Sequence, residues 1–462
     1  MACSLVAQQP EISEYRIRFQ KMSADADGHH DRAWQGWKCD DLTPDLCSLK
    51  ESIGQIPVKG GLNVTYWKYE AVSISNPCNQ TKNDGKDDDD ALASTAFDDD
   101  SAQVVCGGNY PILVIHGGPG ATHNYMLPLK QQACRGRLVL FYDQAGCGQS
   151  ALPANTSLDD YPWLLDPNYY ALEELPLIVN FLGLDSYHII GNSWGSLLSQ
   201  LFALDAADER LASMVLSGTF SDAQHYIQGQ WDPDDGNLGS LPPFVQRRLH
   251  ELEAAKDYDS EEYQAIVKVL TDFFTGRTAP SPDCVRDADA GTNEEIYVGM
   301  QGPSEFAIGG TLEHYNVTAR LSGLTKLPVL LTSGKYDTMR PKVVEEVYKA
   351  LPIAEWVFLE RSGHMSMIDE PGPMNDAIGD FLNRVEMARL SSQPFAASRK
   401  VPYMAALEMS ASQMKIAHGW PHALAAVCTI FVSLLVGWLV GYYSSTGRNR
   451  HGYEKLGDVV HG

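Results

Sequence analysis

Residues 187–195 read Tyr-His-Ile-Ile-Gly-Asn-Ser-Trp-Gly, an apolar run that ends in the pattern Gly-x-Ser-x-Gly. A short apolar run of this kind is typical of a strand buried on both faces of a parallel sheet. The pattern predicts a tight turn from this strand into a helix, where the glycines allow close backbone approach and the Ser193 hydroxyl points outward. This one stretch therefore predicts a strand, a helix and a nucleophile between them.

Similar apolar runs recur along the chain, with helix-length segments such as 171–182 and 196–206 between most of them. The predicted strands are 111–115, 138–142, 187–190, 214–216, 329–332 and 355–359. Residues 53–73 alternate in polarity about Gly60-Gly61, which indicates a two-stranded hairpin. Strands that alternate with helices indicate an α/β fold with a mainly parallel sheet.

The chain divides into segments of different composition. They are an N-terminal extension 1–52, a first core part 53–220 with an acidic insert 76–105, a helical cap 221–311, a second core part 312–388, a linker 389–422, a transmembrane helix 423–443 and a polar tail 444–462. The insert holds eight Asp and two Lys, which predicts a solvated loop. A Ca²⁺ site is the alternative, but the spaced ligand pattern of known calcium loops is absent.

The segment 423–443 has 21 residues without a charge, long enough to cross a hydrocarbon layer of about 30 Å. Its orientation is left open. The basic residues that follow it place the tail in the cytosol by the positive-inside rule, whereas the absence of a recognisable signal peptide favours a cytosolic catalytic domain on a C-terminal anchor. A lumenal domain would also agree with four Asn-x-Ser/Thr sequons, at Asn63, Asn79, Asn155 and Asn316.

The overall composition excludes several classes of protein. A formal charge of −24 argues against a nucleic-acid binder, because such proteins neutralise phosphates with Lys and Arg. Nine cysteines, spread from Cys3 to Cys428, fit neither a small disulfide scaffold nor a zinc module. The 44% hydrophobic content is that of a globular chain with a buried core.

A serine hydroxyl needs a base to take its proton, and the base needs an orienting carboxylate. Asp337 follows the predicted strand 329–332, and His364 follows the predicted strand 355–359. The order Ser, Asp, His is that of α/β-hydrolases, and all three loops leave the carboxyl edge of the sheet. We therefore predict an α/β-hydrolase fold with Ser193, Asp337 and His364 as a catalytic triad. Activity should fall at acid pH, because a charged imidazole cannot accept the serine proton.

Acyl transfer also needs donors for the oxyanion, which are typically backbone N–H groups. The loop His116-Gly-Gly-Pro-Gly120 closes the predicted strand 111–115 and resembles loops that supply such a donor. Trp194, directly after the nucleophile, is expected to supply the second N–H. A phosphate loop is disfavoured, because no Gly-Lys-Ser/Thr sequence follows the glycines.

Several motifs together resemble the proline iminopeptidases, serine aminopeptidases of the α/β-hydrolase fold related to tricorn-interacting aminopeptidases and amino-acid amidases. They are His116-Gly-Gly-Pro-Gly120, Tyr142-Asp-Gln-Ala-Gly-Cys-Gly-Gln-Ser150, Gly191-Asn-Ser-Trp-Gly-Ser196, Met300-Gln-Gly-Pro-Ser-Glu-Phe306 with Gly310-Thr-Leu312, and Gly363-His364. The resemblance spans roughly residues 53–385. It implies the same triad, and it assigns the oxyanion donors to Gly118 and Trp194.

The resemblance also implies how a substrate is chosen. The family removes an N-terminal residue, preferably proline, and holds its free α-amino group with acidic side chains of the cap. Glu305 occupies a matching position, and Glu262 in Ser-Glu-Glu-Tyr is a second candidate. Ala145 stands where many members have Arg or Leu, which bears on specificity more than on catalysis.

These features predict a membrane-anchored serine aminopeptidase that releases N-terminal proline, or another small residue, from small peptides through an acyl-enzyme. An amidase or esterase acting on amino-acyl amides or small esters in a biosynthetic pathway is the alternative, and a catalytically silent fold used for binding is a third. No metal or cofactor is implied, because the nucleophile, base and donors all belong to the protein. The sequence leaves the oligomeric state open.

Overall fold

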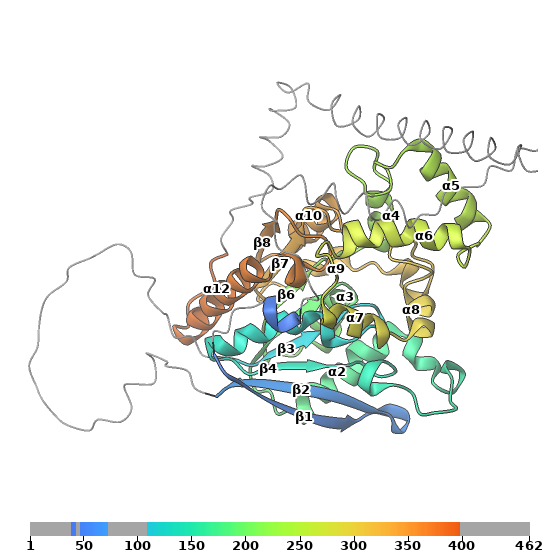
Figure 1. Cartoon of the computed structure of the whole chain (residues 1–462). Helices are drawn as coiled ribbons and strands as arrows, with labels where there is room; N and C mark the ends of the chain where they lie inside the picture. The colour runs from blue at the N-terminus through green and yellow to red at the C-terminus, as the bar shows by residue number, and fades with distance from the viewer. Residues whose placement is uncertain (1–37, 43–46, 73–108, 398–462) are drawn as a thin grey trace, which may run out of the picture. The chain divides into compact units, whose positions relative to one another are not determined.

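The computed structural model describes residues 38–42, 47–72 and 109–397, and its centre is one eight-stranded sheet (Figure 1). The strand order is β1-β2-β4-β3-β5-β6-β7-β8. From β4 to β8 in this order every neighbouring pair is parallel, whereas the pairs β1–β2 and β2–β4 are antiparallel. The strands are β1 Leu49–Pro57, β2 Asn63–Ala71, β3 Ile112–Ile115, β4 Val139–Tyr142, β5 Tyr187–Asn192, β6 Leu211–Ser217, β7 Val329–Gly334 and β8 Ala354–Leu359.

This arrangement confirms the predicted α/β fold with its mainly parallel sheet, and it contains the predicted hairpin. β1 and β2 pair over their whole length, from Leu49 opposite Ala71 to Pro57 opposite Asn63. The hairpin turn places Gly60 and Gly61 at φ values of 72° and 76°. Only glycine adopts such values without a steric cost, which explains the Gly-Gly pair in the turn.

Helices connect most of the parallel strands. α3 (Trp194–Leu201) packs against β3, β5 and β6, and α12 (Pro371–Leu390) packs against β6, β7 and β8. The predicted helix 171–182 is a π-helical turn, η8 (Tyr169–Glu174), followed by α2 (Leu175–Phe181). The predicted helix 196–206 is α3 followed by a second π-helical turn, η9 (Phe202–Ala206). α10 (Pro341–Ala350) packs against β7 and β8, and the short α11 (Ser366–Asp369) packs against β7.

Between β6 and β7 the chain forms helices and no strand of the sheet. They are α4 (Ala223–Gln230), α5 (Pro243–Ala254), α6 (Glu261–Leu270), α7 (Asp283–Ala290), α8 (Glu294–Met300) and α9 (Thr318–Leu321). In Figure 1, α5 and α6 lie beside α4 and away from the edge strands β1 and β2. Part of this region has its own small apolar core, formed by Leu238, Leu249, Leu252, Tyr263, Leu270 and Phe306.

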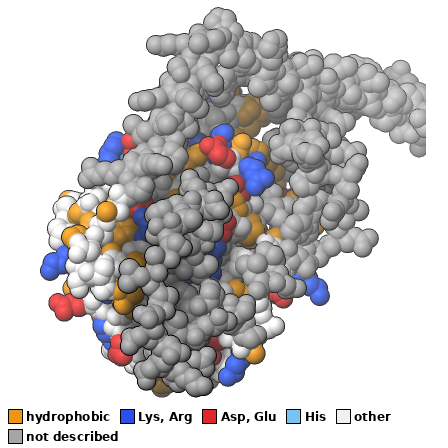
Figure 2. Space-filling model, turned by 90° about the vertical axis from the view of Figure 1, so that its left-hand side faces the viewer, with side chains coloured by type: hydrophobic (Ala, Val, Ile, Leu, Met, Phe, Trp, Pro, Cys, Tyr) orange, Lys and Arg blue, Asp and Glu red, His pale blue; other side chains and the backbone are white. Residues whose placement is uncertain are grey.

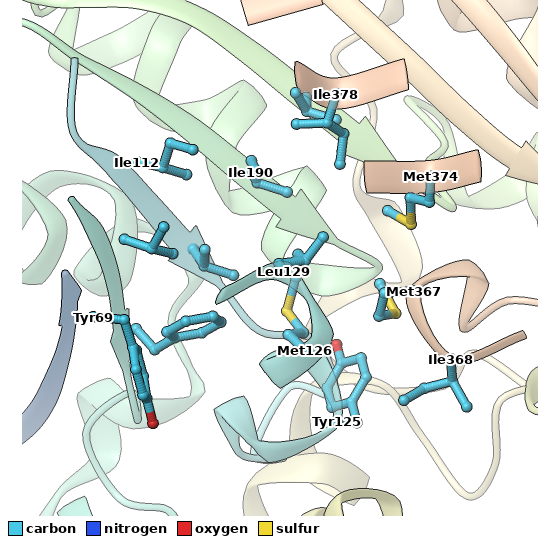
Figure 3. Packing of buried hydrophobic residues seen from close by; sticks show 14 of the residues in the cluster. Tyr69, Ile112, Tyr125, Met126, Leu129, Ile190, Met367, Ile368, Met374 and Ile378 are labelled. Atoms are coloured by element: carbon cyan, nitrogen blue, oxygen red, sulfur yellow. The ribbon is translucent and has the colours of Figure 1, made fainter. Parts of the chain in front are cut away.

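The main core is formed where the parallel strands meet η4 (His123–Arg135), α11 and α12. Figure 3 shows side chains from these elements converging, among them Ile112, Met126, Leu129, Ile190, Met374 and Ile378. All six are fully buried. Burial of one such side chain contributes about 1.5–3 kcal/mol, so this cluster holds the strands that end at the candidate site.

The visible described surface on one face of the molecule carries side chains of several types (Figure 2). Figure 2 shows acidic, basic and apolar side chains interspersed on one face. The large apolar side chains that remain exposed include Ile53, Phe181, Phe244, Val298 and Leu390, which come from different elements. Scattered apolar side chains are normal on a protein surface.

Several predicted segments fall outside the described residues. They are the acidic insert 76–105, most of the N-terminal extension, the predicted membrane span 423–443 and the tail 444–462. Within 38–42, 47–72 and 109–397, no helix has both the length and the hydropathy that a bilayer crossing requires. The predicted span is not among the residues covered by that finding.

A buried ionic cluster ties α12 to the sheet. Glu386 of α12 accepts hydrogen bonds from Arg137 Nε and Nη2 at 3.1 and 2.9 Å, and its side chain and that of Arg137 are fully buried. His188 of β5 lies 3.1 Å from the same carboxylate. Burial alone would raise the pKa of Glu386, but these two partners hold it below its usual value.

Glu386→Ala should lower the free energy of unfolding by about 3–5 kcal/mol, because it leaves the Arg137 guanidinium buried without its counter-charge. Urea titration of the purified chain measures this change. Glu360→Ala is the matched control, since Glu360 forms an exposed pair with Lys335 and should lose no more than about 1 kcal/mol. Equal losses in the two variants would contradict the structural role of the cluster.

Candidate active site

Ser193 lies in the sharp turn between β5 and α3, as the sequence predicts. Its φ and ψ values are 54° and −126°, which non-glycine residues rarely adopt. The two glycines on either side of Ser193 are needed because neighbouring backbone leaves no room for a side chain there. A Cβ on Gly191 would lie 2.3 Å from the carbonyl oxygen of Gly195, and one on Gly195 would lie 2.2 Å from the carbonyl oxygen of Ile115. The turn therefore presses the α3 terminus against β3 and β5, and presents Ser193 at the carboxyl end of the sheet.

His364 and Asp337 meet at the carboxyl ends of β7 and β8. Nδ1 of His364 lies 2.7 Å from Oδ1 of Asp337, and both side chains are buried. The same carboxylate oxygen accepts a hydrogen bond from the backbone N–H of Met339 at 2.9 Å. Nε2 of His364 is buried without a hydrogen-bond partner within the described part of the chain. The imidazole thus has one nitrogen held by Asp337 and the other free to accept a proton.

The turn at Ser193 and the loop of His364 are joined through Asn192. Its side-chain amide donates to the backbone carbonyl of His364 at 3.4 Å and to that of Ser217 at 3.2 Å. β5, β6, β7 and β8 are successive neighbours in the sheet, so the loops after them share one edge. The structure therefore brings all three residues of the predicted triad to the same edge.

The pKa of His364 reflects two carboxylates. Burial lowers it, but the charges of Asp337 and Glu305 outweigh burial and raise the pKa of His364 to about 9. As pH falls through this value the imidazole becomes charged and can no longer accept a proton. The expected loss of activity at acid pH therefore extends to neutral pH in the free protein.

The two predicted oxyanion donors belong to the segments that meet at Ser193: Trp194 follows Ser193 directly, and Gly118 follows Gly117, where a Cβ would lie 2.8 Å from Cβ of Ser193. Trp194 is the first residue of α3, so its N–H has no acceptor within its own helix. Gly118 has a φ of 112°, a value that favours glycine. The preceding N–H, that of Gly117, is already used, because it donates to the hydroxyl of Tyr125 at 2.7 Å. Among the residues that the structure describes, no hydrogen-bond acceptor is found for the N–H of Gly118 or of Trp194.

Two side chains that the sequence reasoning did not single out hold this arrangement. The Tyr125 hydroxyl accepts from Gly117 N–H and donates to Oδ1 of Asn192 at 2.8 Å. Gln144 accepts from the indole N–H of Trp194 at 2.8 Å and donates to the carbonyl of His116 at 3.0 Å. Gln144 lies inside the motif of residues 142–150, which could have drawn attention to it, whereas no sequence pattern marks Tyr125.

His116 is part of this support. Its Nε2 accepts from the backbone N–H of Gln144 at 3.0 Å, which leaves Nδ1 to donate to the carbonyl of Gly117 at 2.9 Å. Burial lowers the pKa of His116 to about 4, so the ring is neutral at physiological pH. Its hydrogen bonds give it a supporting role in the glycine loop.

Glu305 lies next to the pair formed by His364 and Asp337. Its Oε1 accepts from the hydroxyl of Thr338 at 3.1 Å and from that of Tyr226 at 3.2 Å. Thr338 Oγ1 also lies 3.4 Å from Oδ1 of Asp337. Burial raises the pKa of Glu305, and the charge of Asp337 raises it further, although His364 and Thr338 oppose this. The predicted amine anchor is therefore a partly buried carboxylate adjoining the candidate base.

The other predicted anchor is not brought to this position. Glu262 lies in the first turn of α6, where both of its carboxylate oxygens accept from Arg248, at 2.9 and 2.6 Å. Arg248 also holds the pKa of Glu262 below its usual value. The loosely matched cap sequence did not reveal this pairing, because Arg248 comes from the preceding helix, α5.

Comparisons with known proteins identify the family to which this segment is similar. A family described as alpha/beta hydrolase fold matches residues 110–371. A proline iminopeptidase of Heyndrickxia coagulans is 36% identical over 280 residues, which cover 60% of this chain and 92% of that protein. A proline iminopeptidase of Clostridium botulinum is 35% identical over 285 residues, with the same shares covered.

Solved structures show the same fold. The crystal structure of proline iminopeptidase from Mycobacterium smegmatis aligns with a TM-score of 0.58 and 24% identity, over 73% of this chain and all of that one. The crystal structure of VinJ aligns with a TM-score of 0.57 and 25% identity, over 72% of this chain and 98% of that one.

Labelling of Ser193 by a fluorophosphonate should slow as pH falls through about 9, because the reaction requires neutral His364. In Glu305→Gln the midpoint should move to lower pH, since one of the two carboxylates that raise the pKa of His364 is removed. The labelling rate is measured from pH 6 to 10, and Ser193→Ala provides the background. A rate that does not change over this range would argue against His364 as the base.

Gly117→Ala should reduce the labelling rate by about 10²- to 10³-fold, because the new Cβ would displace the loop that carries the Gly118 N–H, and this loss is typical when an oxyanion donor is displaced. The new Cβ would lie 2.8 Å from Cβ of Ser193 and 2.9 Å from the Tyr125 hydroxyl. Gly372→Ala is the control, because nothing lies within 4 Å of its Cβ. Circular dichroism shows whether both variants are folded. If two folded variants are labelled equally fast, the expected collision of a Cβ at position 117 with Ser193 and Tyr125 is contradicted.

Proposed function

Because the chain belongs to the proline iminopeptidase family of α/β-hydrolases, we propose that it releases N-terminal proline, or another small residue, from peptides. The observation that carries this proposal is the position of Glu305. A partly buried carboxylate beside the candidate base is suited to binding the free ammonium group of a peptide terminus. A general esterase has no need for such a group.

In the proposed reaction, Ser193 attacks the carbonyl carbon of the first peptide bond while Nε2 of His364 takes the hydroxyl proton. Asp337 orients the imidazole through its hydrogen bond to Nδ1 and stabilises the imidazolium that forms. His364 then gives the proton to the leaving amine, and the shortened peptide departs. Water, activated by His364, attacks the acyl-enzyme and releases the first residue as a free amino acid.

The oxyanion formed in each half of the reaction would accept hydrogen bonds from the N–H groups of Gly118 and Trp194. Such donors act strongly because they are oriented before the charge develops. Tyr125 and Gln144 keep the donors oriented, since they tie the glycine loop to the turn at Ser193 and to the Trp194 indole.

Binding of the substrate amine would also act on the base. Glu305 is one of the carboxylates that raise the pKa of His364. An ammonium group at Glu305 compensates that negative charge, so the pKa of His364 should fall when a free-amine substrate binds. The neutral, proton-accepting imidazole is then favoured at neutral pH, and a substrate with a free amine assists its own hydrolysis.

Glu305→Gln should lower kcat/KM for a prolyl fluorogenic amide by roughly 10- to 100-fold, the range for losing a hydrogen bond to a charged group. Hydrolysis of an N-blocked ester should change by less than the free-amine activity, because it does not use the anchor. The control is Glu295→Gln in the exposed first turn of α8. Glu262→Gln tests the second anchor expected from the sequence, and it should leave both activities unchanged.

The same panel tests the alternative of an amidase or esterase. If Glu305→Gln leaves the free-amine and N-blocked substrates equally active, recognition of the amine by Glu305 is contradicted and the alternative is favoured. If no substrate is turned over and Ser193 is not labelled, a hydrolase function is contradicted.

A further inference from the structure

Two disulfide bonds lie apart from the proposed chemistry. Cys39 is joined to Cys284 and Cys47 to Cys134, across 245 and 87 residues of sequence. Among the cysteines that the structure describes, Cys147 alone is a free thiol, and it is buried. The pairing could not be read from the sequence, because nine cysteines allow many combinations.

Both bonds fasten the N-terminal segment to the hydrolase core. Cys39 begins the short helix η1 (Cys39–Leu42), and its partner Cys284 lies in α7. Cys47 lies just before β1, and its partner Cys134 lies in η4. Cys134 and Cys284 fall inside the segment that matches the hydrolase family, 110–371, whereas Cys39 and Cys47 precede it. The two bonds therefore attach an extension that lies outside the matched segment.

A metal site is the alternative at one of these positions. Ligand atoms of Cys39, Asp283 and Cys284 lie within 4.8 Å of one another. However, Oδ1 of Asp283 already accepts from the backbone N–H groups of Cys39 at 2.7 Å and of Cys284 at 2.8 Å. A structural zinc site also needs four ligands. The carboxylate thus holds the backbone of both cysteines in place for their disulfide.

Three asparagines of the predicted sequons lie within the described residues. Asn63 begins β2, Asn155 lies in the loop before η6 (Leu158–Asp160), and both are exposed. Asn155 has a φ of 66° and lies in a turn. Asn316 is exposed as well, but its side-chain nitrogen donates to Asp222 at 2.7 Å. Asn63 and Asn155 therefore offer the better sites for a bulky modification.

We propose that the described part of the chain folds in an oxidising compartment of the secretory pathway, where both cysteine pairs are oxidised and Asn63 and Asn155 carry N-linked glycans. Disulfides persist in such compartments and are rare in the cytosol. The proposal selects the lumenal orientation, one of the two that the sequence left open. It agrees with the basic residues after the predicted span 423–443, which itself lies outside the described residues. It does not depend on the proposed function.

Both modifications need a second reactant, which the cell supplies. In each cysteine pair two thiols become one disulfide, and two electrons and two protons pass to the disulfide of a thiol oxidoreductase, which is reduced to a dithiol. At each asparagine, Nδ2 bonds to the anomeric carbon of an oligosaccharide carried on a lipid pyrophosphate. The lipid pyrophosphate leaves, and the amide proton is released.

The glycans are tested on the full chain expressed in a eukaryotic cell. Treatment with peptide N-glycosidase should increase its electrophoretic mobility. Asn63→Gln and Asn155→Asp should each remove one step of that shift, and aspartate tolerates the positive φ at position 155. Ser157→Thr keeps the sequon and should preserve the glycan at Asn155. A wild-type chain whose mobility does not respond would overturn the assignment of the glycans.

The disulfides are tested by alkylating the full chain in denaturant without reductant, followed by peptide mapping. We expect crosslinked peptides that contain Cys39 with Cys284 and Cys47 with Cys134, and an alkylated Cys147. Alkylation of all five of the cysteines that the structure describes would overturn the oxidising compartment. Release of zinc together with free thiols at Cys39 and Cys284 would do the same and would favour the metal site. Activity is not a readout here, so failure of the proposed function leaves this test unaffected.

Discussion

The arrangement of the candidate site depends on the turn that holds Ser193 at a φ of 54° between β5 and α3. A backbone in this conformation costs on the order of 1–3 kcal/mol, so the surrounding structure has to hold it there. Contacts of Gly191 and Gly195 with neighbouring backbone leave no room for a Cβ, and the N–H of Ser193 donates to the carbonyl of Ser217 on β6. The buried core under the parallel strands thereby fixes where the nucleophile stands.

Electrostatics also couples the proposed amine anchor to the candidate base. Glu305 comes from the region inserted between β6 and β7, whereas Asp337 and His364 come from the loops after β7 and β8. Thr338 lies between the two carboxylates, within hydrogen-bond distance of both. Because each carboxylate raises the pKa of His364, a cation bound at Glu305 would lower it. The inserted region therefore contributes to the raised pKa of His364, and in the proposed function Glu305 also binds the substrate amine.

The two disulfides attach the N-terminal segment to the hydrolase core. They join a segment that precedes the hydrolase match to η4 and α7, two elements that pack against each other. A covalent attachment of this kind restricts the unfolded chain and so favours the folded state. It also ties the attachment of Cys39 and Cys47 to the redox state of the compartment in which the chain folds.

Sequence alone was sufficient for the parallel strands, the hairpin, the order of Ser193, Asp337 and His364, and the region without strands between β6 and β7. These features depend on local periodicity and on short motifs, which are visible in neighbouring residues. The cysteine pairs, the Arg248 partner of Glu262, and the roles of Tyr125 and Thr338 needed the tertiary structure. Each of them joins residues from different elements, and no local pattern specifies which distant side chain will lie within bonding distance.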